Sequence, residues 1–116
     1  MTEITIYHNP RCTKSRQTLA LLEDKGINPK VVEYLKTPLN KSEVADILQK
    51  LGKSPRDIIR KGEVEYKESG ADNKDLSDEQ LIEKIAQNPK LLERPIVVNN
   101  QKAAVGRPPE NVLDIL

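Results

Sequence analysis

The stretch EITIYHNPRCTKSRQTLALLEDKG, residues 3–26, predicts a strand, a turn and a helix in that order. Ile4 and Ile6 alternate with polar residues, which is typical of a half-buried strand, and the His-Asn-Pro that follows ends it. Leucines then recur at helical spacing, and Gly26 is placed to end the helix. Cys12, the only cysteine of the chain, therefore falls at or just before a helix N-terminus.

The rest of the sequence extends this start to an α/β protein. Residues 31–35, VVEYL, are short and rich in β-branched side chains, so they predict a second strand. Because a helix joins the two strands, a right-handed βαβ unit with parallel strands is expected. PIVV and KAAVG, on either side of an Asn-Asn-Gln turn, predict an antiparallel hairpin, and PENVLDIL predicts a closing C-terminal helix.

Residues 40–93 predict a helical block between the second strand and the hairpin. Asn40 with Glu43 and Ser77 with Gln80 have the spacing of capping boxes, and each pair precedes apolar residues at helical spacing. A shorter helix is expected from Ser54-Pro55 through Arg60. No repeat or linker divides the chain, so a single domain over residues 1–116 is predicted.

Composition excludes several classes of function. The 116 residues carry 19 Lys and Arg against 18 Asp and Glu, so a net charge of +1 gives no general attraction to nucleic acid or acidic membranes. No apolar run approaches the roughly 20 residues of a membrane span, and no signal peptide is recognised, so a cytoplasmic protein is expected. One cysteine and one histidine cannot form an internal disulfide or a four-ligand zinc site.

The position of Cys12 favours a reactive thiol. A helix N-terminus and nearby cations lower the pKa of a cysteine, and Arg11, Lys14 and Arg16 surround this one. The free N–H groups of the first helical turn could also hold an oxyanion beside the sulfur. The alternative is a small buried side chain without reactivity, which is common for free cysteines. Position and charge alone leave both interpretations open.

Two neighbours of the cysteine have two possible roles each. Ser15 completes a C-x-x-S motif and could donate a hydrogen bond to the thiolate, or it could cap the helix. His8 could tune the thiol, or it could form a local hydrogen bond at the end of the strand.

Three arginines stand beside features of the predicted fold: Arg60 in the short helix, Arg94 before Pro95, and Arg107 before Pro108. Each alone is consistent with a solvated surface residue. Together they could bind a tetrahedral oxyanion, because arginine supplies forked donors. A phosphatase loop of the form C-x5-R is excluded, since Thr18 occupies the position that the arginine would need.

Four separated segments of the chain resemble the glutaredoxin-dependent arsenate reductases. They are ITIYHNPxC followed by SRxTL, IRK around Arg60, ERPIVV at 93–98, and GRPPENVLDIL at the C-terminus. The sequence departs from the best-known pattern after the cysteine, where Gly-Thr is common and Thr13-Lys14 stands here.

The resemblance implies a thioredoxin-like fold, with a mixed four-stranded sheet and a helical insertion at about 40–93 between strands 2 and 3. It implies that Cys12 attacks arsenate, that Arg60, Arg94 and Arg107 bind the oxyanion, and that Pro95 is a cis-proline facing the active-site loop. His8, Ser15 and Arg16 would support the site. Glutathione would be the co-substrate and glutaredoxin the partner that clears the glutathionylated cysteine, with no bound cofactor or metal and a monomeric protein.

Two alternatives to an arsenate reductase remain. Thiol-sensing, RNA-polymerase-binding regulators of the Spx type resemble the same fold, but they typically carry C-x-x-C, and Ser15 replaces the second cysteine here. A related reductase that acts on a different oxyanion or thiol is the other.

Overall fold

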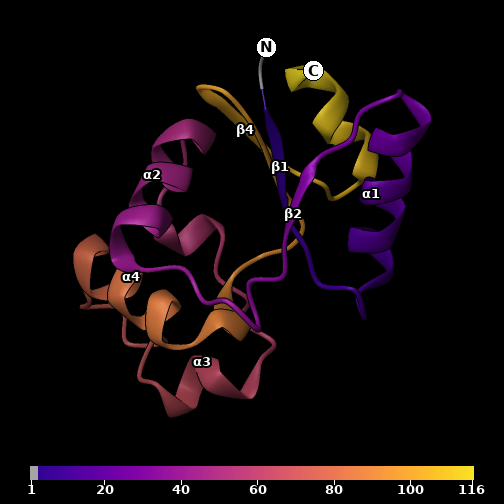
Figure 1. The fold of residues 1–116 in the computed structure, drawn as a ribbon. Helices are drawn as coiled ribbons and strands as arrows, with labels where there is room; N and C mark the ends of the chain where they lie inside the picture. Colours follow the sequence, from indigo (N-terminus) through magenta and orange to yellow (C-terminus); the bar gives the residue numbers. More distant parts are fainter. Residues whose placement is uncertain (1–2) are drawn as a thin grey trace. The chain divides into compact units, whose positions relative to one another are not determined.

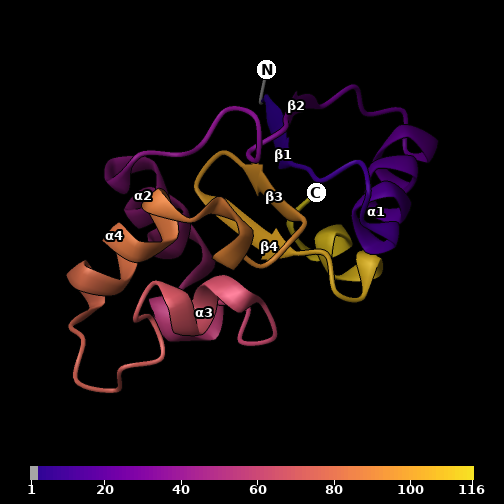
Figure 2. The same ribbon diagram turned by 90° about the horizontal axis from the view of Figure 1, so that it is seen from below.

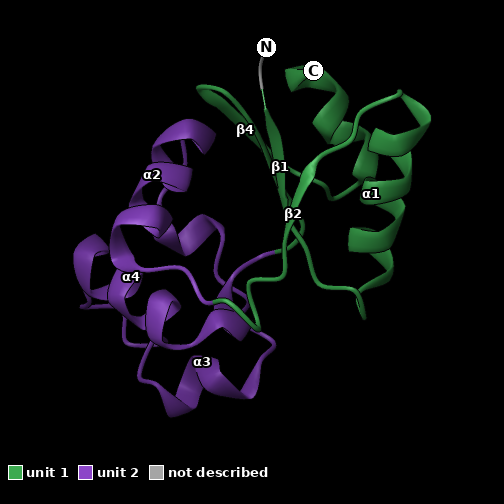
Figure 3. Ribbon diagram, viewed as in Figure 1, with its two compact units in different colours: residues 1–37, 94–116 green, residues 38–93 purple. Residues whose placement is uncertain are grey.

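The computed structural model describes residues 3–116, and the chain forms two compact units, which Figure 3 distinguishes by colour. Unit 1 contains residues 1–37 and 94–116, and unit 2 contains residues 38–93. The single domain expected over residues 1–116 stays a prediction.

Unit 1 is built on a mixed sheet of four strands in the order β2-β1-β3-β4. The strands are β1 (Ile4–Tyr7), β2 (Lys30–Val32), β3 (Ile96–Asn99) and β4 (Lys102–Val105) (Figures 1 and 2). β1 pairs with β2 in parallel, while β3 is antiparallel to both β1 and β4. The predicted mixed four-stranded sheet, its parallel first pair and its hairpin are confirmed.

The core of unit 1 lies between the sheet and two segments packed on one face of it. Helix α1 (Thr13–Asp24) and the 3-10 segment η3 (Pro109–Ile115) lie side by side in both Figures 1 and 2. The fully buried side chains between these segments and the sheet are Ile6, Leu22, Val97 and Val112. Since Leu22 comes from α1, this apolar contact fixes the helix against the strand that precedes the cysteine loop.

Unit 2 contains the helices that interrupt the chain between β2 and β3. They are α2 (Lys41–Leu51), α3 (Val64–Glu68) and α4 (Asp78–Gln87), with 3-10 turns η1 (Pro55–Asp57) and η2 (Pro89–Leu91). Both predicted capping boxes are present, at the starts of α2 and α4. Each box satisfies two backbone N–H groups that a helix start leaves open, so these two helices begin where the sequence indicated. The predicted helical insertion between strands 2 and 3 is confirmed.

Two predicted elements have different boundaries in unit 1. The strand expected at 31–35 spans only Lys30–Val32, because the N–H groups of Lys36 and Thr37 donate to the carbonyl of Glu33 and turn the chain. The C-terminal helix is a 3-10 segment rather than an α-helix. Its last turn is held in part by tertiary contact, since the Asn99 side-chain amide donates to the Ile115 carbonyl.

The prediction of a short helix from Ser54 through Arg60 is wrong in its extent. Only Pro55–Asp57 is helical, and Ile59 instead forms an isolated antiparallel bridge with Leu92. This bridge is stabilised by backbone hydrogen bonds from Arg60 to Leu91 and from Glu93 to Ile58, each 2.7 Å long. A long-range pairing therefore overrides the local helical pattern.

Gly106 occupies a position in unit 1 where a side chain has no room. A Cβ atom there would lie 2.5 Å from Thr18 Oγ1 and 2.8 Å from Pro95 Cγ. The Gly106 N–H donates to the Pro95 carbonyl over 2.9 Å, so the backbone cannot move away without losing this bond. The close approach ties the end of β4 to α1 and to the segment before β3.

We predict that Gly106→Ala destabilises the protein by about 1–3 kcal/mol, as an overpacked methyl group does. Urea unfolding followed by circular dichroism should show a lower midpoint with an unchanged slope. Gly62→Ala is the control, because a Cβ atom at Gly62 meets nothing within 4 Å. Equal midpoints for the two variants would contradict the packing argument.

Candidate active site

The loop between β1 and α1 is held by the side chain of Ser15, which is fully buried. Its hydroxyl oxygen accepts the Asn9 N–H over 3.0 Å and lies 2.6 Å from His8 Nδ1. The Asn9 carbonyl then accepts the Cys12 N–H over 3.0 Å, and the Asn9 side chain accepts the Arg11 N–H over 3.1 Å. These bonds fix the backbone on both sides of the turn that presents the cysteine.

His8 is held as a neutral imidazole at this site. Burial lowers its pKa below the ordinary value, and the charge of Arg16 lowers it further, while Glu33 opposes the shift. A neutral ring has one donor and one acceptor nitrogen. The Ser15 hydroxyl oxygen accepts the Asn9 N–H, and its proton is free to be donated to His8 Nδ1 in the tautomer that carries the ring proton on Nε2.

The contacts of His8 and Ser15 are therefore mainly with the loop. His8 forms the local hydrogen bond that one of its two interpretations anticipated. The N-cap of α1 is Cys12 itself rather than Ser15, and the hydroxyl of Ser15 points to His8 and Asn9. Arg16 also supports the loop, because its guanidinium donates to the Pro10 carbonyl over 2.9 Å and to Thr13 Oγ1 over 3.3 Å.

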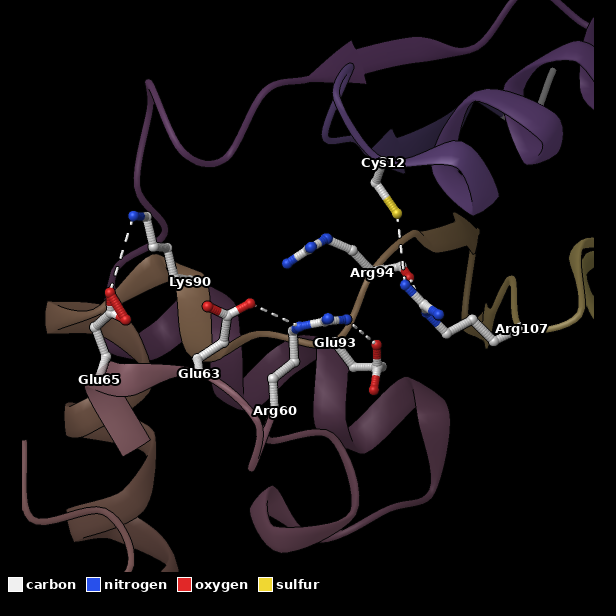
Figure 4. A network of polar contacts seen from close by, with 8 residues as sticks. All are labelled: Cys12, Arg60, Glu63, Glu65, Lys90, Glu93, Arg94 and Arg107. Atoms are coloured by element: carbon white, nitrogen blue, oxygen red, sulfur yellow. Dashed lines mark hydrogen bonds and ion pairs between the residues drawn. The ribbon is translucent and has the colours of Figure 1, made fainter. Parts of the chain in front are cut away.

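The Cys12 thiol is half-buried and lies beside two arginines of unit 1 (Figure 4). Arg107 Nη2 lies 3.5 Å from Cys12 Sγ, and the Arg94 side chain also hydrogen-bonds the sulfur. Burial raises the pKa of the thiol, but the Ser15 N–H, the Arg94 hydrogen bond and the charges of Arg94 and Arg107 outweigh it. The net effect is a thiol pKa below its ordinary value, which favours the nucleophilic thiolate.

The hairpin brings these two arginines together. Ile96 pairs with Val105, so Arg94 and Arg107 lie just outside the open end of the β3–β4 ladder. Arg107 Nε donates to the Arg94 carbonyl over 2.7 Å, which orients its guanidinium. The peptide bonds before Pro95 and Pro108 are both cis. The cis geometry predicted for Pro95 is therefore present.

Arg60, the third predicted anion ligand, lies in unit 2 between two carboxylates. Its Nη1 is 2.9 Å from Glu93 Oε1, and its Nε is 3.3 Å from Glu63 Oε1 (Figure 4). All three side chains are roughly one quarter exposed, at 23%, 28% and 27% for Arg60, Glu63 and Glu93. Two carboxylates thus engage this guanidinium.

No group of three or more His, Cys, Asp or Glu side chains that could hold a metal ion occurs among residues 3–116. In the same part of the chain, no helix has the length and apolar character needed to cross a membrane.

A half-buried thiol whose pKa is lowered, beside two arginines, can attack an electrophile that carries negative charge. Comparison with known proteins leads to a family. Residues 7–115 match the ArsC family. This chain belongs to the ArsC family. An arsenate reductase of Neisseria meningitidis serogroup A is 54% identical over 117 residues, which cover 100% of both chains. The uncharacterised protein YfgD of Escherichia coli K12 is 51% identical over 98% of this chain and 97% of its own length.

A solved structure leads to the same family. The arsenate reductase from Vibrio cholerae is 49% identical and superposes with a TM-score of 0.95 over 99% of this chain and 98% of its own. The thioredoxin-like fold that the sequence resemblance implied for this ArsC-family chain is confirmed.

Sequence reasoning missed the two carboxylates around Arg60 and the part played by Asn9. Glu63 lies three residues after Arg60, a spacing at which side chains can meet within one turn, so this pair had a local signal. Glu93 had none, because it reaches Arg60 through the bridge between Ile59 and Leu92. For Asn9 the sequence indicates first of all the turn that ends the first strand.

We predict that the alkylation rate of Cys12 rises with pH around a midpoint below about 8.5, the value for a free cysteine. Arg94→Gln and Arg107→Gln should each move the midpoint upward and slow alkylation at pH 7, because each removes a donor and a positive charge that stabilise the thiolate. Lys102→Gln, at an exposed position in β4, should leave it unchanged. A common midpoint for all four proteins would show that the arginines do not act on the thiol.

Proposed function

We propose that this chain reduces arsenate to arsenite, with Cys12 as the nucleophile, glutathione as co-substrate and glutaredoxin as electron donor. The observation that carries the proposal is the thiol at the N-cap of α1, whose pKa is lowered by Arg94 and Arg107. Arsenate is proposed as the substrate because two relatives named arsenate reductase are 54% and 48% identical in sequence over nearly the whole chain. We also propose that the protein acts as a monomer in the cytoplasm, the compartment in which glutathione keeps thiols reduced.

The thiolate of Cys12 attacks the arsenic atom, a sulfur–arsenic bond forms, and one arsenate oxygen leaves as water after protonation. Glutathione supplies a second thiol. The glutathione sulfur loses its proton and attacks the Cys12 sulfur, so that a sulfur–sulfur bond forms while the sulfur–arsenic bond breaks. The electron pair of the broken bond stays on arsenic, which is released as arsenite, and a disulfide joins Cys12 to glutathione. Glutaredoxin attacks this mixed disulfide and returns the Cys12 thiol. The sequence has one cysteine, so no internal disulfide can replace the step with glutathione.

The arginines stabilise the charge of the tetrahedral anion while the sulfur attacks. Arg94 and Arg107 already contact Cys12 Sγ, so an arsenate that reaches the sulfur meets both guanidiniums. Forked donors held in place before the reaction stabilise the developing charge without reorganisation. Arg60 is proposed as the third ligand, on the resemblance of its segment to that of the reductases.

The test is turnover of arsenate with glutathione, glutaredoxin and the enzymes that recycle them. We expect arsenate-dependent consumption of reducing equivalents, and a mass increase of one glutathione on the protein when glutaredoxin is omitted. Cys12→Ser should give neither signal while keeping the wild-type circular dichroism spectrum. Turnover supported by thioredoxin without glutathione would exclude this route. Polymerase binding without turnover would favour the regulator of the Spx type.

We further predict that Glu93→Gln lowers the KM for arsenate by about threefold, which is the scale of a partly exposed ion pair. The neutral amide no longer competes with the anion for Arg60 Nη1, whereas Arg60→Lys loses the fork and should raise KM about tenfold. Glu68→Gln, at an exposed position in α3, is the matched control. A higher KM for Glu93→Gln would mean that Glu93 holds Arg60 in place for the anion instead of competing with it.

A further inference from the structure

A groove of about 440 Å³ lies in unit 1 between α1 and the start of η3. Its walls are Lys14, Gln17 and Leu21 from one face of the helix and Pro108, Pro109 and Glu110 from the segment opposite. From Lys14 to Leu21 the helix rises about 10 Å, at 1.5 Å per residue. The groove is therefore long enough for part of an extended peptide.

One end of the groove lies next to the thiol along both walls. Lys14 is in the first turn of α1, whose N-cap is Cys12. Pro108 directly follows Arg107, whose Nη2 is 3.5 Å from Cys12 Sγ. A molecule whose sulfur reaches Cys12 can extend one arm into the groove.

The groove carries one charge of each sign. Lys14 and Glu110 are both exposed, and neither takes part in an ion pair among the described residues. Gln17 adds an amide that can donate or accept, and Leu21 and the two prolines add apolar contact. This set fits a ligand with a carboxylate and an ammonium group close together at the end of a short chain. Lys14 also stands in the segment where this sequence departs from the best-known pattern of the arsenate reductases.

The geometry points to this groove as the binding site for the γ-glutamyl end of glutathione, an inference that rests on the proposed function. Lys14 binds the α-carboxylate, Glu110 binds the α-ammonium group, and the sulfur of the tripeptide is left at Cys12. The opposite end of glutathione carries a carboxylate but no ammonium group, so it would use only one of the two charges. Because the groove is lined by both a positive and a negative side chain, it favours the γ-glutamyl end.

The test uses a reaction that needs no arsenate. The Cys12 thiolate attacks oxidised glutathione, a bond forms between Cys12 and one glutathione sulfur, the original disulfide breaks, and the other glutathione leaves as a thiolate. Intact-protein mass gives the rate of this reaction. The rate with the neutral disulfide of 2-mercaptoethanol gives the intrinsic reactivity of the thiol, so the ratio of the two rates reports recognition alone. Loss of arsenate turnover would not affect this ratio, so the two proposals can fail separately.

We expect Lys14→Gln and Glu110→Gln each to lower the ratio about threefold, on the scale of one exposed charge pair. Lys102→Gln and Asp114→Asn, which change charges outside the groove, should leave it unchanged. The disulfide of γ-glutamylcysteine should show the same sensitivity as oxidised glutathione. The disulfide of N-acetylcysteinylglycine, which has the glycine carboxylate and no ammonium group, should show none at Glu110.

Three results would overturn the assignment. The first is a ratio unchanged in both groove variants. The second is a ratio raised by Glu110→Gln, because Glu110 would then repel the carboxylates of the ligand instead of binding its ammonium group. The third is equal sensitivity for the disulfide of N-acetylcysteinylglycine, which would assign the groove to the glycine end.

Discussion

The buried hydroxyl of Ser15 is the contact on which the thiol site depends. It accepts the Asn9 N–H and bonds His8 Nδ1, and Asn9 in turn accepts the N–H of Cys12. A buried polar group left without a partner costs about 1–3 kcal/mol. The loop therefore cannot shift without leaving Ser15, His8 or Asn9 unsatisfied, and this constraint keeps the sulfur within 3.5 Å of Arg107. The helix start and the arginines can act on the thiol because the loop is held in one place.

Partial burial makes the local charges effective. A fully exposed thiol would have its neighbours screened by water, whereas a fully buried one would be held in its neutral form. Cys12 lies between these limits, and there the hydrogen bond from the Ser15 N–H, together with the interactions with Arg94 and Arg107, outweighs the effect of burial on the thiol pKa. The net charge of +1 gives no indication of this site, because the site depends on two cations in fixed positions and not on an excess of positive charge.

The features predicted from sequence are those with local causes. The alternation in β1, the capping boxes at Asn40 and Ser77, and the position of Cys12 at the N-cap all depend on residues within a few positions of one another. The end of β2, the 3-10 form of the C-terminal segment and the bridge at Ile59 depend on tertiary contacts, so local patterns could not give them. The same holds for arginine partners: the guanidinium of Arg56 binds the carbonyls of Ala71 and Asn73, which no spacing in the sequence reveals.

The two carboxylates on Arg60 define a condition that the proposed function must meet. Ion pairs between partly exposed groups contribute about 0–1 kcal/mol each. The pairs with Glu63 and Glu93 therefore orient the Arg60 guanidinium but bind it only weakly. An anion that displaces one carboxylate must bind better than that carboxylate does. A doubly charged tetrahedral oxyanion, which accepts both donors of the fork, can do so, whereas a small singly charged anion gains less from the exchange. Glu63 and Glu93 would then contribute to selectivity by raising the affinity that any ligand of Arg60 must reach.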